Sequence, residues 1–159
     1  MNNISILLVE DEAPKRTHIE AFLRDLERNI VIREAMSVTS ALDLLESELP
    51  DLVLLDMSLP TYDVGDRESG GRPQGFGGIE VLRHMSMANL TCPTLVITGY
   101  EAFLREEGPV DLTQLSSELE NEFPGILLGV LHYNSTYAEW KAELTKILAE
   151  FKITSEEVN

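Results

Sequence analysis

The sequence predicts an α/β fold, in which a doubly wound parallel sheet of five strands is covered by five helices. Five short apolar runs are typical of buried strands. Between them, apolar residues recur at the spacing of an amphipathic helix, as at Ile19, Phe22, Leu23 and Leu26. Strands that alternate with helices form parallel sheets covered on both faces, and 159 residues suit one such domain.

Most elements carry a local signal as well. Pro14 suits the first turn of the first helix, where its missing N–H costs nothing. Ser37 or Ser40 can cap the second helix, and the third starts near Gly78. The strands are expected at 4–9, 30–33, 52–55, 94–97 and 126–131, and the apolar stripes of the last two helices are Leu112, Leu115, Leu119, Phe123 and Trp140, Leu144, Ile147, Phe151.

Two stretches interrupt this alternation. Residues 61–78 contain six glycines and no periodicity, which predicts a long insertion after the third strand. It either covers the neighbouring site, selects a partner, or is a tolerated surface loop. Residues 100–111 are expected to form a long irregular connection. The domain should span 1–152, followed by a polar tail at 153–159.

Composition limits the classes of partner. Twelve basic against 28 acidic residues give a net charge of −16, which repels phosphate backbones and anionic membranes. We therefore expect no direct nucleic-acid or membrane partner. Cys92 is the only cysteine, so it forms no internal disulfide, and we expect a buried thiol. The longest apolar runs are strand-sized, which favours a cytoplasmic protein.

Polar residues end three of the predicted strands. Glu10 and Asp11 follow the first strand, Asp56 follows the third just before Pro60, and Thr98 ends the fourth. In a flavodoxin-like order of 2-1-3-4-5 the first and third strands are neighbours, so the three carboxylates should converge. Such a cluster needs a cation, and hard oxygen ligands favour Mg²⁺ or Mn²⁺. Thr98 could donate to an oxyanion placed on Asp56.

Four short motifs stand in order along the chain: Ile-Leu-Leu-Val-Glu10-Asp11-Glu12, Leu-Leu-Asp56-Met-Ser-Leu-Pro60, Gly78-Ile-Glu-Val-Leu-Arg and Thr98-Gly99. Each motif is weak alone, but together, in this order and on the expected elements, they resemble the receiver domain of two-component response regulators. The resemblance covers residues 4 to about 150.

The resemblance implies a role for each site residue. Asp56 would accept a phosphoryl group, and Thr98 would be the switch hydroxyl that turns toward it. Asp11 and Asp56 would bind Mg²⁺ directly, together with the backbone carbonyl of Ser58 and, through water, Glu10. These roles agree with the needs of phosphoryl transfer, which depends on positioning and charge neutralisation.

The resemblance also implies partners. A sensor histidine kinase or a phosphotransfer protein would supply the phosphoryl group, and a downstream protein would respond to it. The chain would act as a phosphoacceptor and not as an enzyme, with at most Mg²⁺-dependent self-phosphorylation and autodephosphorylation.

One expected residue is missing. Receivers normally carry a lysine at the end of the fifth strand, but this chain reads Leu131-His132-Tyr133-Asn134 there. The lysines are Lys15, Lys141, Lys146 and Lys152. His132, Tyr133 and Lys15 are candidate substitutes, with Arg67 and Arg72 of the insertion as further cations. A single histidine at a strand end is, however, more often structural.

The missing lysine leaves a second interpretation open, a pseudo-receiver that uses the same fold as a phosphorylation-independent interaction module. Two other classes fit less well. A haloacid-dehalogenase-type phosphatase has a second aspartate where this chain has Ser58. A dinucleotide-binding domain needs a glycine-rich turn after its first strand, and residues 10–14 are acidic instead.

Overall fold

The computed structural model describes residues 4–26, 29–62, 76–100, 102–105, 108–134 and 138–158. Its main sheet has five strands in the order β2-β1-β3-β4-β7, and every neighbouring pair is parallel. This is the predicted 2-1-3-4-5 order, because β7 is the fifth strand of this sheet along the chain. The strands are β1 (Ile4–Val9), β2 (Ile30–Ala35), β3 (Leu52–Leu55), β4 (Thr94–Thr98) and β7 (Leu127–His132).

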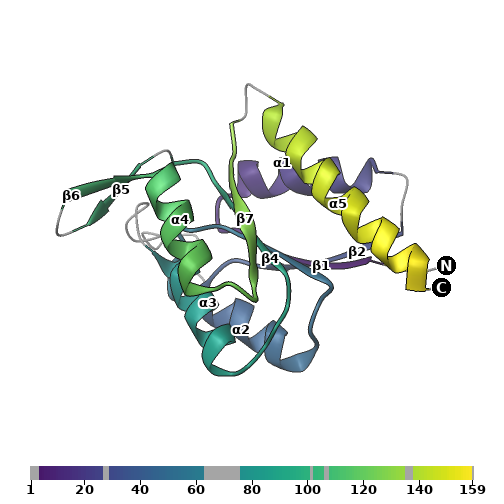
Figure 1. Ribbon diagram of the computed structural model, residues 1–159, viewed down its shortest axis with the longest axis horizontal. Coiled ribbons are helices and arrows are strands. Elements are labelled where there is room, and N and C mark those ends of the chain that lie inside the picture. The colour runs from purple at the N-terminus through teal and green to yellow at the C-terminus, as the bar shows by residue number, and fades with distance from the viewer. Residues whose placement is uncertain are drawn as a thin grey trace.

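Five helices cover the two faces of the sheet (Figure 1). The first helix, α1 (Ala13–Arg24), lies with the last, α5 (Glu139–Val158), on one face. The other face carries α2 (Val38–Ser47), α3 (Gly77–Met87) and α4 (Leu112–Glu122). None of the described helices is long and apolar enough to cross a membrane.

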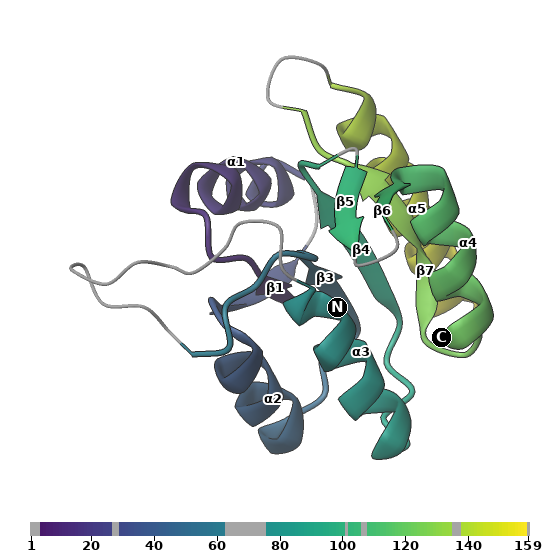
Figure 2. The same cartoon turned by 90° about the vertical axis from the view of Figure 1, so that its left-hand side faces the viewer.

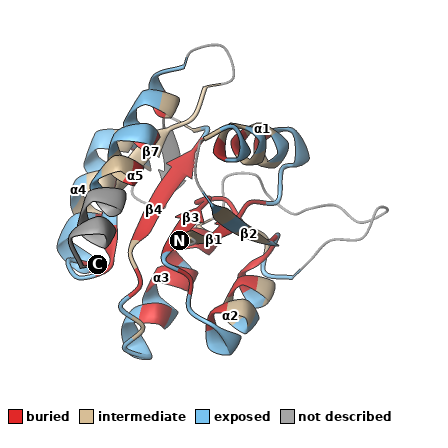
Figure 3. Ribbon diagram, turned by 90° about the vertical axis from the view of Figure 1, so that its right-hand side faces the viewer, coloured by how far each residue is buried: buried red, intermediate tan, exposed pale blue. Residues whose placement is uncertain are grey.

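The core forms two apolar clusters, one on each face. Alternate residues of a strand point to opposite faces, so Leu54 packs toward α1 and α5 while Val53 and Leu55 pack toward α2, α3 and α4. All four residues of β3 are buried, as expected for a central parallel strand (Figure 3). Cys92 is also buried, as predicted, and burial raises the pKa of its thiol to about 11.

Local signals at several helix ends agree with the sequence. Both candidate cap residues act at the start of α2: the Ser37 hydroxyl accepts from the Ser40 N–H at 3.1 Å, and the Ser40 hydroxyl accepts from the Ser37 N–H at 3.1 Å. Pro14 lies in the first turn of α1. At the other end of the chain, α5 continues to Val158, so most of the expected polar tail at 153–159 is helical.

One part of the fold differs from the expectation. Residues 102–105 and 108–111 pair as two antiparallel strands, β5 (Ala102–Arg105) and β6 (Gly108–Asp111), beside α4 (Figures 1 and 2). The expectation of an irregular connection was wrong. Each of these strands has only four residues, so an alternating pattern does not stand out in the sequence. Of the predicted insertion, 63–75 lie outside the described residues, and Gly77 and Gly78 begin α3.

Gly77 and Gly78 hold α3 close to the segment that follows β3. A Cβ on Gly78 would lie 2.5 Å from the Asp56 carbonyl oxygen, and one on Gly77 would lie 2.3 Å from the Leu59 carbonyl oxygen. The Gly78 N–H donates to the Met57 carbonyl at 2.9 Å. The glycine pair therefore fixes the position of the loop that carries Asp56.

Gly78→Ala should lower the free energy of unfolding by about 1–3 kcal/mol, because the added methyl group overlaps backbone that cannot move freely. Gly125→Ala is the matched control, since a Cβ at Gly125 meets nothing within 4 Å. Urea denaturation of the two variants measures the difference. Equal stability of both variants would contradict the close approach of α3.

Candidate functional site

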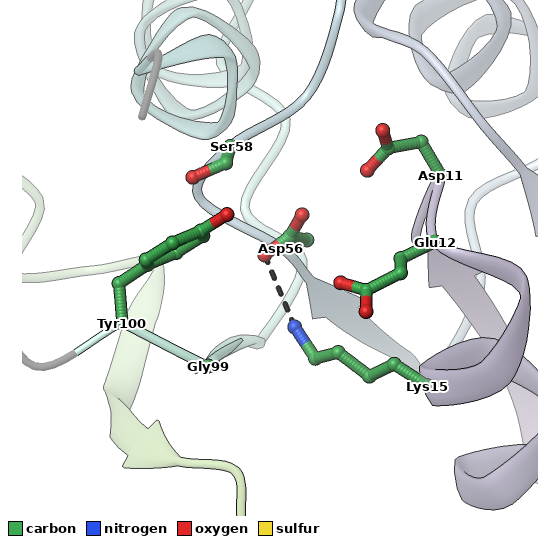
Figure 4. Close-up of a pocket in the computed structure, with 7 residues that line it drawn as sticks. All are labelled: Asp11, Glu12, Lys15, Asp56, Ser58, Gly99 and Tyr100. Atoms are coloured by element: carbon green, nitrogen blue, oxygen red, sulfur yellow. Dashed lines mark hydrogen bonds and ion pairs between the residues drawn. The ribbon is translucent and has the colours of Figure 1, made fainter. Parts of the chain in front are cut away.

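The carboxyl ends of β1, β3 and β4 surround a pocket of about 320 Å³ (Figure 4). Adjacent parallel strands end at the same edge of the sheet, so residues far apart in sequence meet there. In Figure 4, Asp11 and Glu12 face Ser58 and Tyr100 across Asp56. The lining residues are Asp11, Glu12, Lys15, Asp56, Ser58, Gly99 and Tyr100.

Three carboxylates converge at this edge, as the sequence predicts. Glu10, Asp11 and Asp56 each offer one carboxylate oxygen, and these oxygens all lie within 4.8 Å of one another. Glu10 is 2% exposed and Asp56 is 5% exposed, whereas Asp11 is exposed. Partial burial of the Asp11 carboxyl and the nearby Asp56 charge raise the pKa of Asp11 to about 6.

A buried lysine lies among these carboxylates. The Lys15 side chain, from the first turn of α1, is nearly enclosed: the residue is 3% exposed. Its Nζ atom lies 2.7 Å from Glu10 Oε1 and 3.1 Å from Asp56 Oδ1, and it donates to the Ile97 carbonyl oxygen at 2.7 Å. An ammonium group has three N–H donors, so each has an acceptor.

The surroundings keep Lys15 charged. Burial alone would lower its pKa, but the charges of Asp56 and Glu10 and their hydrogen bonds outweigh burial and raise the pKa above its ordinary value. Burial acts in the opposite direction on the Glu10 carboxyl group: it raises the pKa of Glu10, against the lowering effect of Lys15. Glu10 is held in place by two contacts, because its Oε2 also accepts from the Glu12 N–H at 3.1 Å.

The three candidate substitutes for the missing lysine occupy different places. Lys15 contacts Asp56 directly. His132 ends β7 opposite Thr98, and among the described residues it is not part of the pocket lining. Tyr133 contacts Lys15 and not Asp56 in the interactions described: the Lys15 Nζ lies 5.7 Å from the centroid of the Tyr133 ring. Arg67 and Arg72 lie outside the described residues.

Thr98 and Ser58 differ in their hydrogen bonding and in whether they line the pocket. Thr98 is fully buried at the end of β4, next to β3, and its hydroxyl accepts from the Tyr100 N–H at 3.2 Å. Ser58 lines the pocket and is 7% exposed. Its hydroxyl has no hydrogen-bond partner within the part of the chain that the structure describes. The metal-binding role of the Ser58 carbonyl stays a prediction.

Several residues of the site were not predicted. Arg16 donates from Nη1 to the carbonyl oxygens of Glu10 at 3.1 Å and Asp11 at 3.4 Å, which fixes the acidic loop after β1. Tyr100 lines the pocket, and burial together with the charges of nearby carboxylates raises its pKa. Their sequence signals are weak: Arg16 follows Lys15 in a stretch without a recognised motif for a basic residue, and Tyr100 follows the recognised Thr98-Gly99 motif.

His18 and the aromatic residues behind Lys15 form a structural group. The Tyr133 hydroxyl is hydrogen-bonded to His18 Nδ1 at 2.7 Å. The buried Trp140 packs against both, with ring centroids 5.3 Å from His18 and 5.2 Å from Tyr133. These contacts give His18 a packing role on α1, and His18 does not line the pocket.

Comparison with known proteins identifies one family. Residues 6–108 match the response regulator receiver domain. Over 92% of its length, the chain is 26% identical to the Detocs response regulatory protein DtcB of Enterobacter cloacae (strain JD6301), 99% of which is covered.

Solved structures share the fold. A CheY-like response regulator receiver domain protein from Methanospirillum hungatei JF-1 superposes with a TM-score of 0.62 and 18% identity, over 98% of this chain and 99% of that one. The response regulator protein TrrA from Thermotoga maritima, in complex with Mg²⁺-BeF, gives a TM-score of 0.60 and 20% identity, over 90% of this chain and 97% of that one.

The carboxylate cluster predicts an unusual titration. Asp11 should titrate near pH 6 in the folded protein, against its ordinary pKa of 3.8, and Asp56→Asn should lower that midpoint by removing a neighbouring charge. Carbon-detected NMR of the side-chain carboxyl measures both values.

The folded protein keeps this proton at pH values where the unfolded chain has lost it. The free energy of unfolding should therefore fall as the pH rises from about 4 to about 6, and Asp11→Asn should remove that contribution. A wild-type Asp11 that titrates near 4 would contradict the described convergence of charges.

Proposed function

Since the chain belongs to the response regulator receiver domain family, we propose that it is a phosphoacceptor of two-component signal transduction, in which Asp56 receives a phosphoryl group from a phosphohistidine. One observation carries the proposal. Asp56 lies at the carboxyl end of the central strand β3, in a pocket where it meets two further carboxylates and a lysine. This arrangement provides an oxygen nucleophile and charges that position a phosphoryl group.

The transfer needs little covalent assistance from the protein. A carboxylate oxygen of Asp56 attacks phosphorus, and an acyl phosphate bond forms as the P–N bond of the donor phosphohistidine breaks. The bonding electron pair stays on the imidazole nitrogen, which takes up a proton. Asp56 Oδ1 accepts a hydrogen bond from Lys15. The other carboxylate oxygen, Oδ2, would therefore be the one that attacks phosphorus. The protein contributes positioning and charge neutralisation.

The donor set fits Mg²⁺ or Mn²⁺. Three converging carboxylate oxygens are hard ligands, and the pKa of Asp11 is raised first by partial burial and then by the neighbouring Asp56 charge. Asp11 and Asp56 would bind the ion directly, with the Ser58 carbonyl and, through water, Glu10, as in the family pattern. The bound ion would neutralise negative charge on the carboxylates and on the incoming phosphoryl group.

The partners follow from this chemistry. A sensor histidine kinase or a phosphotransfer protein would donate the phosphoryl group in the cytoplasm, and a downstream protein would recognise the phosphorylated state. The chain would act as a substrate of the kinase and not as an enzyme with its own turnover. Self-phosphorylation from small phosphodonors and autodephosphorylation would be its only reactions.

The pseudo-receiver is the second candidate, because β7 ends in His132 and is followed by Tyr133, where the family has a lysine. An interaction module of this kind would keep the fold but would not respond to phosphorylation. The ion pair between Lys15 and Asp56 favours the working acceptor, because a cation is present beside the acceptor carboxylate.

Mg²⁺ followed by beryllofluoride, a phosphoryl mimic, should bind to the wild-type protein. Fluorescence of Trp140 can follow both events, because this residue packs against Tyr133, which adjoins Lys15. Asp11→Ala combined with Asp56→Ala should abolish both responses. Asp25→Ala combined with Asp43→Ala is the control, since it removes two exposed carboxylates that lie outside the pocket, one at the C-cap of α1 and one on α2. Unchanged metal binding in the Asp11→Ala, Asp56→Ala variant would show that the metal site is assigned to the wrong residues. A wild type that binds Mg²⁺ but ignores beryllofluoride would favour the pseudo-receiver.

Acetyl phosphate should label the protein once, on Asp56. Intact-mass spectrometry should show one added phosphoryl group in the wild type and none in Asp56→Asn. The label should be lost at alkaline pH, because an acyl phosphate hydrolyses there more readily than a phosphoserine or a phosphothreonine. Equal labelling of the two proteins would place the acceptor on another residue.

A further inference from the structure

Lys15 joins three strand ends that phosphorylation would affect. We propose that Lys15, from α1, is the phosphoryl-binding cation of this chain, and that its hydrogen bond to the Ile97 carbonyl makes it the link between Asp56 and β4. The proposal rests on the proposed function, and assigns to a helical residue the role that the family gives to a lysine on the last strand of the sheet.

Lys15 is positioned before any phosphoryl group arrives. Its first-turn place in α1 directs the side chain across the carboxyl edge of the sheet (Figure 4). Arg16, the next residue, holds the loop after β1 through two carbonyl oxygens, and so anchors the start of α1 to that loop. Every N–H of the Lys15 ammonium group has an acceptor. A cation fixed in this way needs little reorganisation when charge develops beside it.

The end of β7 complements this arrangement. Tyr133 is the first residue after β7, and its N–H donates to the Thr98 carbonyl at 2.8 Å. Its ring packs beside the Lys15 ammonium group, and its hydroxyl is fixed by His18. The strand end that would carry a lysine in the family therefore supplies an aromatic wall for a lysine that comes from α1.

The acceptors of Lys15 differ in charge, and this difference determines which of them Lys15 would give up when Asp56 is phosphorylated. Two are carboxylates, whereas the Ile97 carbonyl is neutral. A phosphoryl group on Asp56 adds strong anionic acceptors, and hydrogen bonds to anionic acceptors are about twice as strong as those to neutral ones. Lys15 therefore exchanges the Ile97 carbonyl for a phosphoryl oxygen. Ile97 directly precedes Thr98, so the exchange frees the backbone beside the switch hydroxyl.

Lys15→Met tests the role of the charge, because methionine keeps an unbranched apolar chain and removes the ammonium group. Two quantities should change in opposite directions. Mg²⁺ should bind more tightly, since a competing cation has left the carboxylate cluster. Labelling of Asp56 by acetyl phosphate at saturating Mg²⁺ should slow by about 10- to 100-fold, the loss expected for one charge-assisted hydrogen bond.

Lys146→Met is the matched control, because it makes the same substitution at an exposed position on α5 and should alter neither quantity. Equal labelling rates in Lys15→Met and the wild type would overturn the proposal. Loss of both metal binding and labelling would also overturn it, since Lys15 would then be a structural residue.

The link to β4 is tested in the wild-type protein, and so does not depend on the folding of any variant. The carbonyl carbon of Ile97 should move upfield when Mg²⁺ and beryllofluoride bind, as a carbonyl does when it loses a hydrogen bond. An Ile97 signal that stays in place while beryllofluoride binds would overturn the link. A wild type that neither binds beryllofluoride nor labels on Asp56 would instead overturn the proposed function itself.

Discussion

The burial of negative charge at one edge of the sheet is the constraint on which the rest of this structure depends. Glu10 and Asp56 are almost fully enclosed at the ends of β1 and β3, and isolated carboxylates in such surroundings would be strongly destabilising. Lys15 compensates both at once, at 2.7 and 3.1 Å. The first turn of α1 and the loop before it are therefore part of the site as well as part of the scaffold.

The topology makes this concentration of charge possible. Because β1 lies between β2 and β3, the acidic loop after β1 is placed beside Asp56, and the neighbouring β4 presents the Ile97 carbonyl to the same space. The glycine pair at the start of α3 allows the backbone after Asp56 to approach that helix closely. Each contact joins segments that are distant in sequence, so the site depends on the packing of the whole sheet.

The sequence was most informative where a local signal determines the structure. Apolar runs predicted the strands of the main sheet, and the polar residues directly after them predicted the edge where the carboxylates converge. Both signals are local, because hydrophobic periodicity and the end of a strand are visible in a short stretch of sequence. The sequence did not distinguish Lys15 from the other candidate substitutes for the missing lysine. Its role depends on the direction of its side chain across the sheet edge, and residue spacing does not encode that direction. The pairing of β5 with β6 was not predicted, because these strands are too short to show a period.

The contact between Lys15 and Tyr133 has a consequence for how this domain can change over generations. Lys15 comes from α1 and Tyr133 is the first residue after β7, yet the Lys15 Nζ lies 5.7 Å from the centroid of the Tyr133 ring. Loss of Lys15 alone would leave two enclosed carboxylates without this counter-charge, and a second lysine at the end of β7 would add an ammonium group to the same edge of the sheet. The effect of a substitution at either place on the charge balance of this edge therefore depends on the residue at the other.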